Sequence, residues 1–167
     1  MPNHWHLIFK LLTDLELSEF MHLLTLTHTK RWHAYYETVG TGPIYQGRYK
    51  SFPVENGEHF LKVARYVERN ALRANLVERA QDWSWSSLNM RANPSAFPSV
   101  RLFEWPQAVP ENWVELVNRP DSKSELNALR RSVNKGTPFG EERWQLETAN
   151  RLKLESSLRN PGRPRKA

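Results

Sequence analysis

The chain has 167 residues, which is enough for one domain with a core, or for one domain and an appendage. Its 24 Lys and Arg residues against 18 Asp and Glu residues give a formal net charge of +6, which favours nucleic acid, ahead of a membrane surface, as the partner. The absence of cysteine excludes disulfides and thiolate zinc sites. No apolar run reaches the roughly 20 residues of a membrane span and no signal peptide is visible, so we expect a cytoplasmic protein.

The first predicted element is a β-strand over residues 4–12. Successive side chains of a strand point to opposite faces, so alternate apolar residues are expected on a buried face: Trp5, Leu7, Phe9 and Leu11. His4 and His6 then lie side by side on the other face. Two imidazoles on one rigid face form half of a divalent-metal site, although a solvated sheet face with two polar residues is the simpler alternative.

A helix is expected from Ser18, a possible N-cap, to about Tyr36. Its apolar positions are expected to face the core: Phe20, Met21, Leu23, Leu24 and Leu26. After a Gly-rich loop, residues 44–52 are rich in aromatics and alternate in polarity, which predicts a second strand. Its polar, basic face is either solvent-exposed or suited to a phosphate backbone, and it contains Gln46, Arg48 and Lys50.

A second helix is predicted over residues 57–73. One side carries a stripe expected to be buried: Phe60, Leu61, Val63, Ala64, Val67 and Ala71. Another side carries residues at three- and four-residue steps: His59, Lys62, Tyr66, Asn70 and Arg73. A phenol and an amide are thereby placed one turn apart. Taken alone, Tyr66 also suits a half-buried position on the helix.

Residues 74–90 turn the chain back, with Trp83 and Trp85 expected to cover the core. Residues 91–122 contain five prolines and predict an irregular connection with a short helix near 111–118.

Residues 122–158 predict two more helices around a turn at 136–140, the first capped by Ser122 or Ser124. This pair resembles a DNA-binding helix-turn-helix in outline, as many helical hairpins do. The chain ends in a basic tail suited to phosphate contacts or to solubility, with Arg159, Arg163, Arg165 and Lys166.

The two histidines, an asparagine and a tyrosine together suggest phosphate chemistry. Two neutral histidines need a further oxygen ligand to hold Mg²⁺ or Mn²⁺, and the amide oxygen of Asn70 can supply it. A metal of this kind polarises a phosphate, which Tyr66 could attack to form a covalent phosphotyrosine. No nucleotide-binding loop is present, which fits a transesterification that needs no high-energy cofactor.

These residues lie in motifs that resemble a known family. Residues 2–7, Pro-Asn-His-Trp-His-Leu, are similar to the PNHxHL form of the HUH motif in single-tyrosine transposases. Residues 66–77, Tyr-Val-Glu-Arg-Asn-Ala-Leu-Arg-Ala-Asn-Leu-Val, resemble that family's YxxxNPxRAxLV block. The segments Tyr-Gln-Gly-Arg-Tyr-Lys-Ser at 45–51 and Trp-Ser-Trp-Ser-Ser at 83–87 match it too. Asparagine as third ligand and the arginine-rich end point to the REP-associated tyrosine transposases.

The resemblance implies a ferredoxin-like α+β domain, an antiparallel sheet with helices packed on it. It implies a divalent metal at His4, His6 and Asn70 and a nucleophile at Tyr66. Its substrates would be single-stranded DNA beside palindromic hairpins, cut and rejoined through a 5′-phosphotyrosine. Candidate DNA contacts, chosen by charge and proximity, are Gln46, Arg48, Lys50, Arg69 and Arg73.

The resemblance also suggests how the chain is divided. Residues 1–92 would be the nuclease domain, 93–121 a connection, 122–158 a helical hairpin and 159–167 a flexible tail. Family members carry a strand and a helix before the HUH strand, so an N-terminally shortened domain is expected. Ala71 replaces the family's common proline, which we expect to be mild because alanine continues a helix.

Other functions remain open on the sequence. One alternative is a catalytically impaired remnant that binds DNA hairpins without cutting them, and another is a structural zinc-binding module. Family members occur as monomers and as dimers, so a homodimer is possible.

Overall fold

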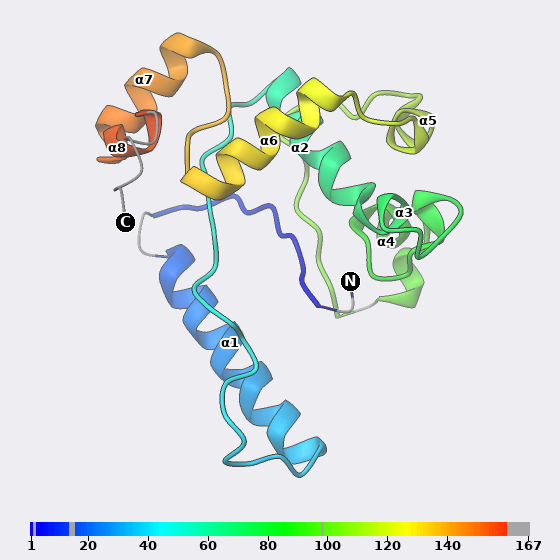
Figure 1. Cartoon of the computed structure of the whole chain (residues 1–167). Helices are drawn as coiled ribbons and strands as arrows, with labels where there is room; N and C mark the ends of the chain where they lie inside the picture. The colour runs from blue at the N-terminus through cyan, green and yellow to red at the C-terminus, as the bar shows by residue number, and fades with distance from the viewer. Residues whose placement is uncertain (2, 14–15, 98, 160–167) are drawn as a thin grey trace. The chain divides into compact units, whose positions relative to one another are not determined.

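A computed structural model describes residues 1, 3–13, 16–97 and 99–159 (Figure 1). Its elements are α1 (Glu16–Tyr35), α2 (Glu58–Glu68), α3 (Asn70–Arg73), η1 (Ala80–Asp82), α4 (Ser87–Ala92), η2 (Pro94–Ala96), α5 (Trp113–Asn118), α6 (Lys123–Lys135), α7 (Glu142–Arg151) and α8 (Glu155–Leu158). No described helix is both long enough and apolar enough to cross a bilayer.

The predicted ferredoxin-like sheet is wrong, because none of the described residues lies in a β-strand. The β-pairing found among them is a single parallel bridge between Val54 and Phe139. Residues 44–52, predicted as a strand, are irregular. The described part of the chain is therefore helical, with long irregular connections.

Among the residues that the structure describes, the segment 4–12 has no strand partner, and its alternate residues are not buried. The exposed fractions of Trp5, Leu7 and Phe9 are 39%, 46% and 38%, while Ile8, on the opposite parity, is 41% exposed. Alternating apolar residues mark a buried face only when the segment is hydrogen-bonded to another strand and a second layer covers one of its faces. Neither condition is met among the described residues, and the alternation therefore fails as a guide to burial.

The chain divides into two compact units, one made of Met1–Leu7 and Ser51–Ala167 and the other of Ile8–Lys50. This division runs through the predicted domain 1–92, and the predicted domain boundaries stay a prediction. The candidate residues His4, His6, Tyr66 and Asn70 all belong to the first unit.

The second unit is built on α1, which confirms the predicted helix. Ser18 lies inside this helix rather than at its cap, and its hydroxyl is 3.2 Å from that of Tyr49. Met21 is buried, whereas Leu23 is 65% exposed and Phe20 is 45% exposed. The prediction that the apolar residues of this helix face a core is therefore wrong for most of them.

The core of the first unit lies against α2, and the predicted buried stripe of this helix is largely confirmed. Phe60 and Ala64 belong to a buried cluster that also contains Trp113 and Val117 of α5. The remaining members of the cluster are Ala80 and Leu88. The predicted short helix near 111–118 is confirmed as α5. The Pro-rich stretch thus contributes to the core, whereas Trp85, expected to cover it, is 72% exposed.

The predicted helix over 57–73 is confirmed with one interruption, at Arg69, between α2 and α3. The helical hydrogen bonds continue through it, from Arg69 N to Arg65 O at 2.9 Å and from Arg73 N to Arg69 O at 2.9 Å. Figure 1 shows α2 leading directly into α3. Residues on successive turns of the two helices therefore share a face.

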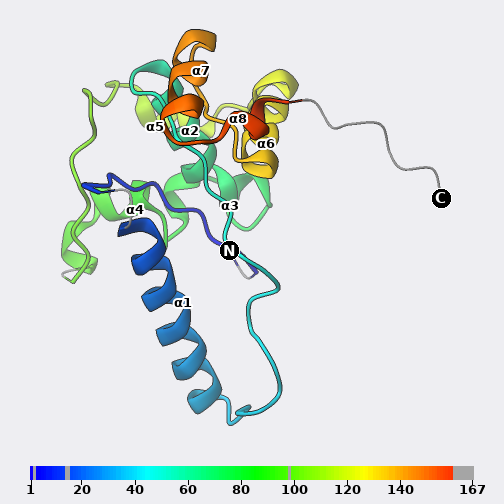
Figure 2. The same ribbon diagram turned by 90° about the vertical axis from the view of Figure 1, so that its left-hand side faces the viewer.

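The predicted C-terminal helices are confirmed as α6 and α7. Ser122 caps α6 in a capping box with Glu125, and Gly136 ends it with φ at 69°, a left-handed conformation that suits glycine. The short helix α8 packs against α7, and the two lie side by side in Figure 2.

The turn between α6 and α7 pairs with the segment that precedes α2. Phe139 N donates to Pro53 O at 2.8 Å, and Glu55 N donates to Phe139 O at 2.9 Å. The backbone N–H of Glu141 donates to Glu55 Oε2 at 2.7 Å. The turn of the predicted hairpin is thus fastened to the same unit as α2.

Candidate nucleic-acid cleavage site

The helices α2 and α3 present Tyr66 and Asn70 one turn apart. Tyr66 is half-buried, and Asn70, the first residue of α3, is 7% exposed. An amide buried to this degree needs partners for its polar atoms. It has two, one at the start of the chain and one on α3 itself.

The first partner of Asn70 is His4. Asn70 Nδ2 lies 3.2 Å from His4 Nε2, and His4 Nδ1 lies 2.7 Å from Asn3 Oδ1. Because the Asn3 oxygen can only accept, His4 carries its proton on Nδ1 and turns an Nε2 lone pair toward Asn70. That lone pair is the one a metal ion would use.

His6 lies beside both His4 and Tyr66. The ring centroids of His4 and His6 are 5.2 Å apart, and those of His6 and Tyr66 are 5.5 Å apart, both pairs meeting edge to face. Burial, and next the nearby His4 and Arg73, lowers the pKa of His6 to about 4. His6 is therefore neutral near pH 7, which leaves a ring nitrogen free to bind a cation.

The structure thus brings together the four residues predicted to form the site. The imidazoles of His4 and His6 are donors that a divalent metal ion accepts, and a hard cation such as Mg²⁺ or Mn²⁺ would also need an oxygen ligand such as the amide of Asn70. No group of three His, Cys, Asp or Glu side chains that could hold a metal exists among the residues that the structure describes. The amide of Asn70 as third protein ligand stays a prediction.

Arg73 contacts two residues of the candidate site. Its Nη2 donates to Asn70 Oδ1, and its guanidinium carbon lies 4.1 Å from the centre of the Tyr66 ring. A guanidinium over an aromatic face is held by a cation–π interaction. Arg73 was predicted to contact DNA, and that role stays a prediction.

A buried carboxylate lies behind this site. The side chain of Asp121 is 6% exposed and lies 3.6 Å from Arg65 Nη2, 3.4 Å from Arg69 Nε and 3.8 Å from Arg73 Nη1. The three arginines come from successive turns of α2 and α3. One negative charge thus faces three positive ones, which leaves a positive excess next to the residues that would bind a phosphate.

Arg69 has an intramolecular role. Its Nη1 donates to the carbonyls of Val117 at 3.2 Å and Asn118 at 2.7 Å, and its side chain is 13% exposed. It therefore ties the end of α2 to the chain that follows α5. Its predicted contact with DNA stays a prediction.

The other predicted DNA contacts lie elsewhere in the chain, and their role stays a prediction. Gln46, Arg48 and Lys50 belong to the second unit. Arg159 is exposed, and its carbonyl accepts a hydrogen bond from Lys135 Nζ at 3.0 Å. The predicted contacts of the tail at Arg163, Arg165 and Lys166 lie outside the described residues.

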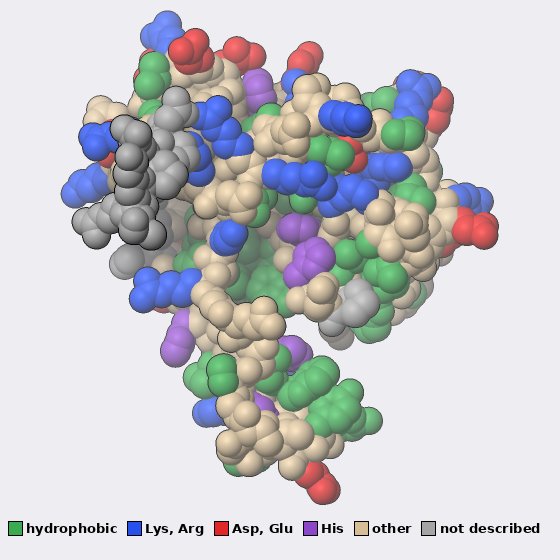
Figure 3. All heavy atoms as spheres, viewed as in Figure 1, with side chains coloured by type: hydrophobic (Ala, Val, Ile, Leu, Met, Phe, Trp, Pro, Cys, Tyr) green, Lys and Arg blue, Asp and Glu red, His purple; other side chains and the backbone are tan. Residues whose placement is uncertain are grey.

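Figure 3 shows Lys and Arg side chains gathered near histidines on the face that carries α6 and α2. A surface of this kind is attractive to a phosphate backbone.

Two residues that the sequence reasoning did not assign belong to this cluster. Asn3 orients His4, and its adjacency to His4 within the motif was an available signal. Asp121 lies in the stretch predicted to be an irregular connection. Nothing local in the sequence connects it with three arginines about fifty positions earlier.

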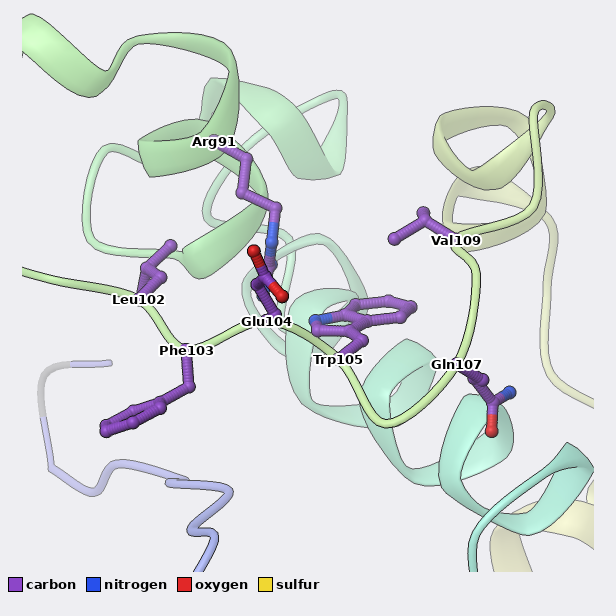
Figure 4. Close-up of a pocket in the computed structure, with 7 residues that line it drawn as sticks. All are labelled: Arg91, Leu102, Phe103, Glu104, Trp105, Gln107 and Val109. Carbon is purple, nitrogen blue, oxygen red and sulfur yellow. The ribbon is translucent and has the colours of Figure 1, made fainter.

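A separate hollow lies between the 102–109 segment and α4, and it offers no comparable chemistry. Its lining includes Arg91, Phe103, Glu104 and Trp105 (Figure 4). Arg91 is already engaged, since it lies over the Trp105 ring at 4.9 Å and binds Glu68 Oε1 at 2.9 Å. Trp105 in turn packs against Phe60 and Trp113. Arg91 and Trp105 therefore pack against each other and against the core.

Comparison with known proteins gives one finding. Residues 1–70 match the family model described as "Transposase IS200 like". No curated protein and no solved structure matches the chain. The matched segment contains His4, His6, Tyr66 and Asn70. It supports the IS200-like transposase family for this part of the chain and, in general terms, a transposase-like function in which DNA is cut and joined.

Proposed function

We propose that this protein cleaves and rejoins single-stranded DNA next to palindromic hairpins, as a REP-associated tyrosine transposase would. Tyr66 is the nucleophile, and His4, His6 and Asn70 hold Mg²⁺ or Mn²⁺. The observation that carries the proposal is the meeting of these residues in one cluster. His6 lies 5.5 Å from Tyr66 between ring centroids, and His4 Nε2 lies 3.2 Å from the Asn70 amide.

The chemistry is a transesterification in which bonds are exchanged one for one. The Tyr66 phenolic oxygen forms a bond to phosphorus, the bond from phosphorus to the 3′ oxygen breaks, and the 5′-phosphate stays on the tyrosine. The phenolic proton passes to solvent, and the 3′ oxygen takes up a proton. A 3′-hydroxyl of another DNA end then attacks the phosphotyrosine and releases Tyr66.

The chain's own residues have distinct parts in this proposal. A metal bound at the site would polarise the scissile phosphate. His4 and His6 would hold it with their ring nitrogens, and Asn3 accepts the hydrogen bond that orients the ring of His4. Arg73, over the Tyr66 ring, offers a positive charge to the phosphate oxygens as charge develops on them.

Charge and the family match both support the proposed substrate class. The net charge of +6 and the positive excess around Asp121 favour a polyanion. The predicted contacts Gln46, Arg48, Lys50 and the basic tail would extend the binding surface along the strand.

A covalent-adduct experiment tests the proposal. The protein is incubated with end-labelled hairpin oligonucleotides of varied stem and flank, with Mn²⁺, and the products are separated on a denaturing gel. We expect a protein–DNA adduct that EDTA abolishes and that Tyr66→Phe does not form. Tyr36→Phe is the matched control, because it removes the hydroxyl of an exposed tyrosine directly after α1 and should leave the adduct intact.

The denaturing gel, a native gel and a melting curve together separate the alternatives. DNA that is shifted on a native gel but never cut, in wild type and Tyr66→Phe alike, would indicate the hairpin-binding remnant. An adduct that persists in Tyr66→Phe would place the nucleophile elsewhere. A melting temperature lowered strongly by EDTA would indicate a structural zinc module.

A further inference from the structure

Arg73 lies between the two residues on which the proposed chemistry depends. It donates to the amide oxygen of Asn70, and it lies over the ring of Tyr66. Arginine has only donors, so the orientation of the Asn70 amide is fixed. Its oxygen faces Arg73, and its nitrogen faces His4.

This orientation conflicts with metal binding. A divalent cation takes an amide oxygen as ligand and not an amide nitrogen. For Asn70 to share a cation with His4, its oxygen must point toward His4 and its NH₂ group toward Arg73. The NH₂ group of Asn70 and the guanidinium of Arg73 would then face each other, and both are hydrogen-bond donors. The guanidinium must therefore move away from the amide.

The carboxylate of Asp121 can accept a hydrogen bond from the displaced guanidinium. Asp121 Oδ2 and Arg73 Nη1 are both buried, neither makes a hydrogen bond among the described residues, and they lie 3.8 Å apart. Arg69 Nε is nearer to Asp121 Oδ2, at 3.4 Å, but it does not form a hydrogen bond with it either. A charge-assisted N–H···O bond is about 2.8 Å long, so a displacement of about 1 Å would form one. A buried carboxylate oxygen without a donor gains free energy when it receives one.

The other arginines of the cluster are held differently. Arg65 donates to the carbonyls of Arg119 and Pro120, both at 2.9 Å, and Arg69 to those of Val117 and Asn118. Arg73 is the one of these three arginines whose described contacts include a candidate metal ligand.

We propose that Asp121 is a positioning residue that acts through Arg73: it competes with the Asn70 amide oxygen for the guanidinium and so determines how readily that oxygen turns to a divalent metal. The inference rests on the proposed function, because it takes Asn70 as a metal ligand. It predicts opposite effects for two residues that touch each other.

Mn²⁺ affinity, measured by calorimetry on the full chain without DNA, tests the inference. Arg73→Gln should bind Mn²⁺ about ten-fold more tightly, because glutamine can accept from the turned amide and carries no charge. Asp121→Asn should bind it about ten-fold more weakly, because Arg73 then remains on Asn70. Arg65→Gln is the matched control, since it removes a charge next to Asp121 without touching Asn70, and should change the affinity by less than about two-fold.

A double variant shows whether Asp121 acts through Arg73. In the Arg73→Gln background, Asp121→Asn should change Mn²⁺ affinity by less than about two-fold, because the residue it acts through is gone. An undiminished effect in that background would show that Asp121 acts by its charge alone and would overturn the inference. Equal or weaker Mn²⁺ binding by Arg73→Gln would overturn it as well.

Two further measurements distinguish the effect of Asp121 from a loss of folding and from the absence of the metal site. Far-UV circular dichroism and thermal melting check that each variant is folded. If Asp121→Asn is not, Asp121→Glu, which keeps the charge, should retain wild-type affinity within about three-fold. His6→Ala distinguishes the two levels of failure. If it binds Mn²⁺ as the wild type does, the metal site of the proposed function is itself wrong.

Discussion

Asn70 Nδ2 lies 3.2 Å from His4 Nε2, although the two residues are 66 positions apart in the sequence. This contact joins the start of the chain to α3 and holds a ring nitrogen of His4 against the amide. The second ring nitrogen of His4 lies 2.7 Å from Asn3 Oδ1. The geometry of the candidate metal site therefore depends on an asparagine that is not itself a ligand.

Replacing Asn3 should weaken metal binding. Asn3→Ala removes the acceptor that keeps the His4 proton on Nδ1, so the ring is free to rotate and to change tautomer. Loss of such a supporting hydrogen bond typically costs about ten-fold in metal affinity, and we expect a loss of that size for Mn²⁺ in calorimetry.

The control for this prediction is Asn127→Ala, which changes an exposed asparagine of α6 and should leave the affinity unaltered. Unchanged Mn²⁺ affinity in Asn3→Ala would mean that the Asn3–His4 hydrogen bond does not orient a metal ligand.

The buried carboxylate of Glu68 should contribute strongly to the free energy of unfolding. Glu68 is 3% exposed and accepts from Ser87 Oγ at 2.5 Å, Arg91 Nη1 at 2.9 Å and Trp113 Nε1 at 2.7 Å. Glu68→Gln removes the charge and presents an NH₂ group to these donors. We expect the free energy of unfolding to fall by about 3 kcal/mol, measured by urea denaturation followed by Trp fluorescence.

Glu58→Gln is the comparison for this experiment, because Glu58 is exposed at the start of the same helix and its pair with Lys62 spans 4.0 Å. It should change the unfolding free energy by less than about 0.5 kcal/mol. A similar small change in Glu68→Gln would show that the three donors are satisfied without the carboxylate.

The close packing of Gly140 leads to a third prediction. A Cβ at this position would lie 2.5 Å from Trp144 Cε3 and 2.6 Å from Glu55 Oε2. Gly140→Ala should therefore push the turn between α6 and α7 away from Glu55 and cost about 1–3 kcal/mol of stability. Thermal melting would measure this loss. Gly47→Ala adds the same methyl group where no atom lies within 4 Å, and a loss as large as that of Gly140→Ala would rule out the packing explanation.

The sequence predicted the helices well because their signals are local. The stripe containing Phe60 and Ala64 recurs at helical spacing, and Ser122 with Glu125 forms a cap within four residues. The site was predicted through motifs, with His4, His6, Tyr66 and Asn70 named before the structure brought them together. Their chemical roles stay predictions.

The errors concern pairings between distant segments. The alternation over 4–12 predicted a strand, but a strand depends on a partner that a single segment does not specify. The bridge between Val54 and Phe139 and the contacts of Asp121 with three arginines lack any local pattern. The exposed apolar residues of α1 show the same limit, because helical periodicity identifies a face but not what covers it.

The cap of α6 leads to the last prediction, which concerns pH. Glu125 Oε2 accepts from the Ser122 N–H at 2.9 Å and from the Ser122 hydroxyl at 2.8 Å, and these hydrogen bonds lower the pKa of Glu125. A carboxyl with a lowered pKa in the folded state stabilises the protein above its ordinary pKa of 4.5, and this stabilisation is lost as the pH falls through the folded-state pKa. Ser122→Ala should cost about 1 kcal/mol at pH 7 and clearly less at pH 3, measured by urea denaturation at both values. Asn127→Ala, at an exposed position further along α6, should show little loss at either pH. A cost of Ser122→Ala that is the same at both pH values would mean that the hydrogen bond from the Ser122 hydroxyl does not contribute to the lowered pKa of Glu125, because the backbone N–H, the larger cause, remains in the variant.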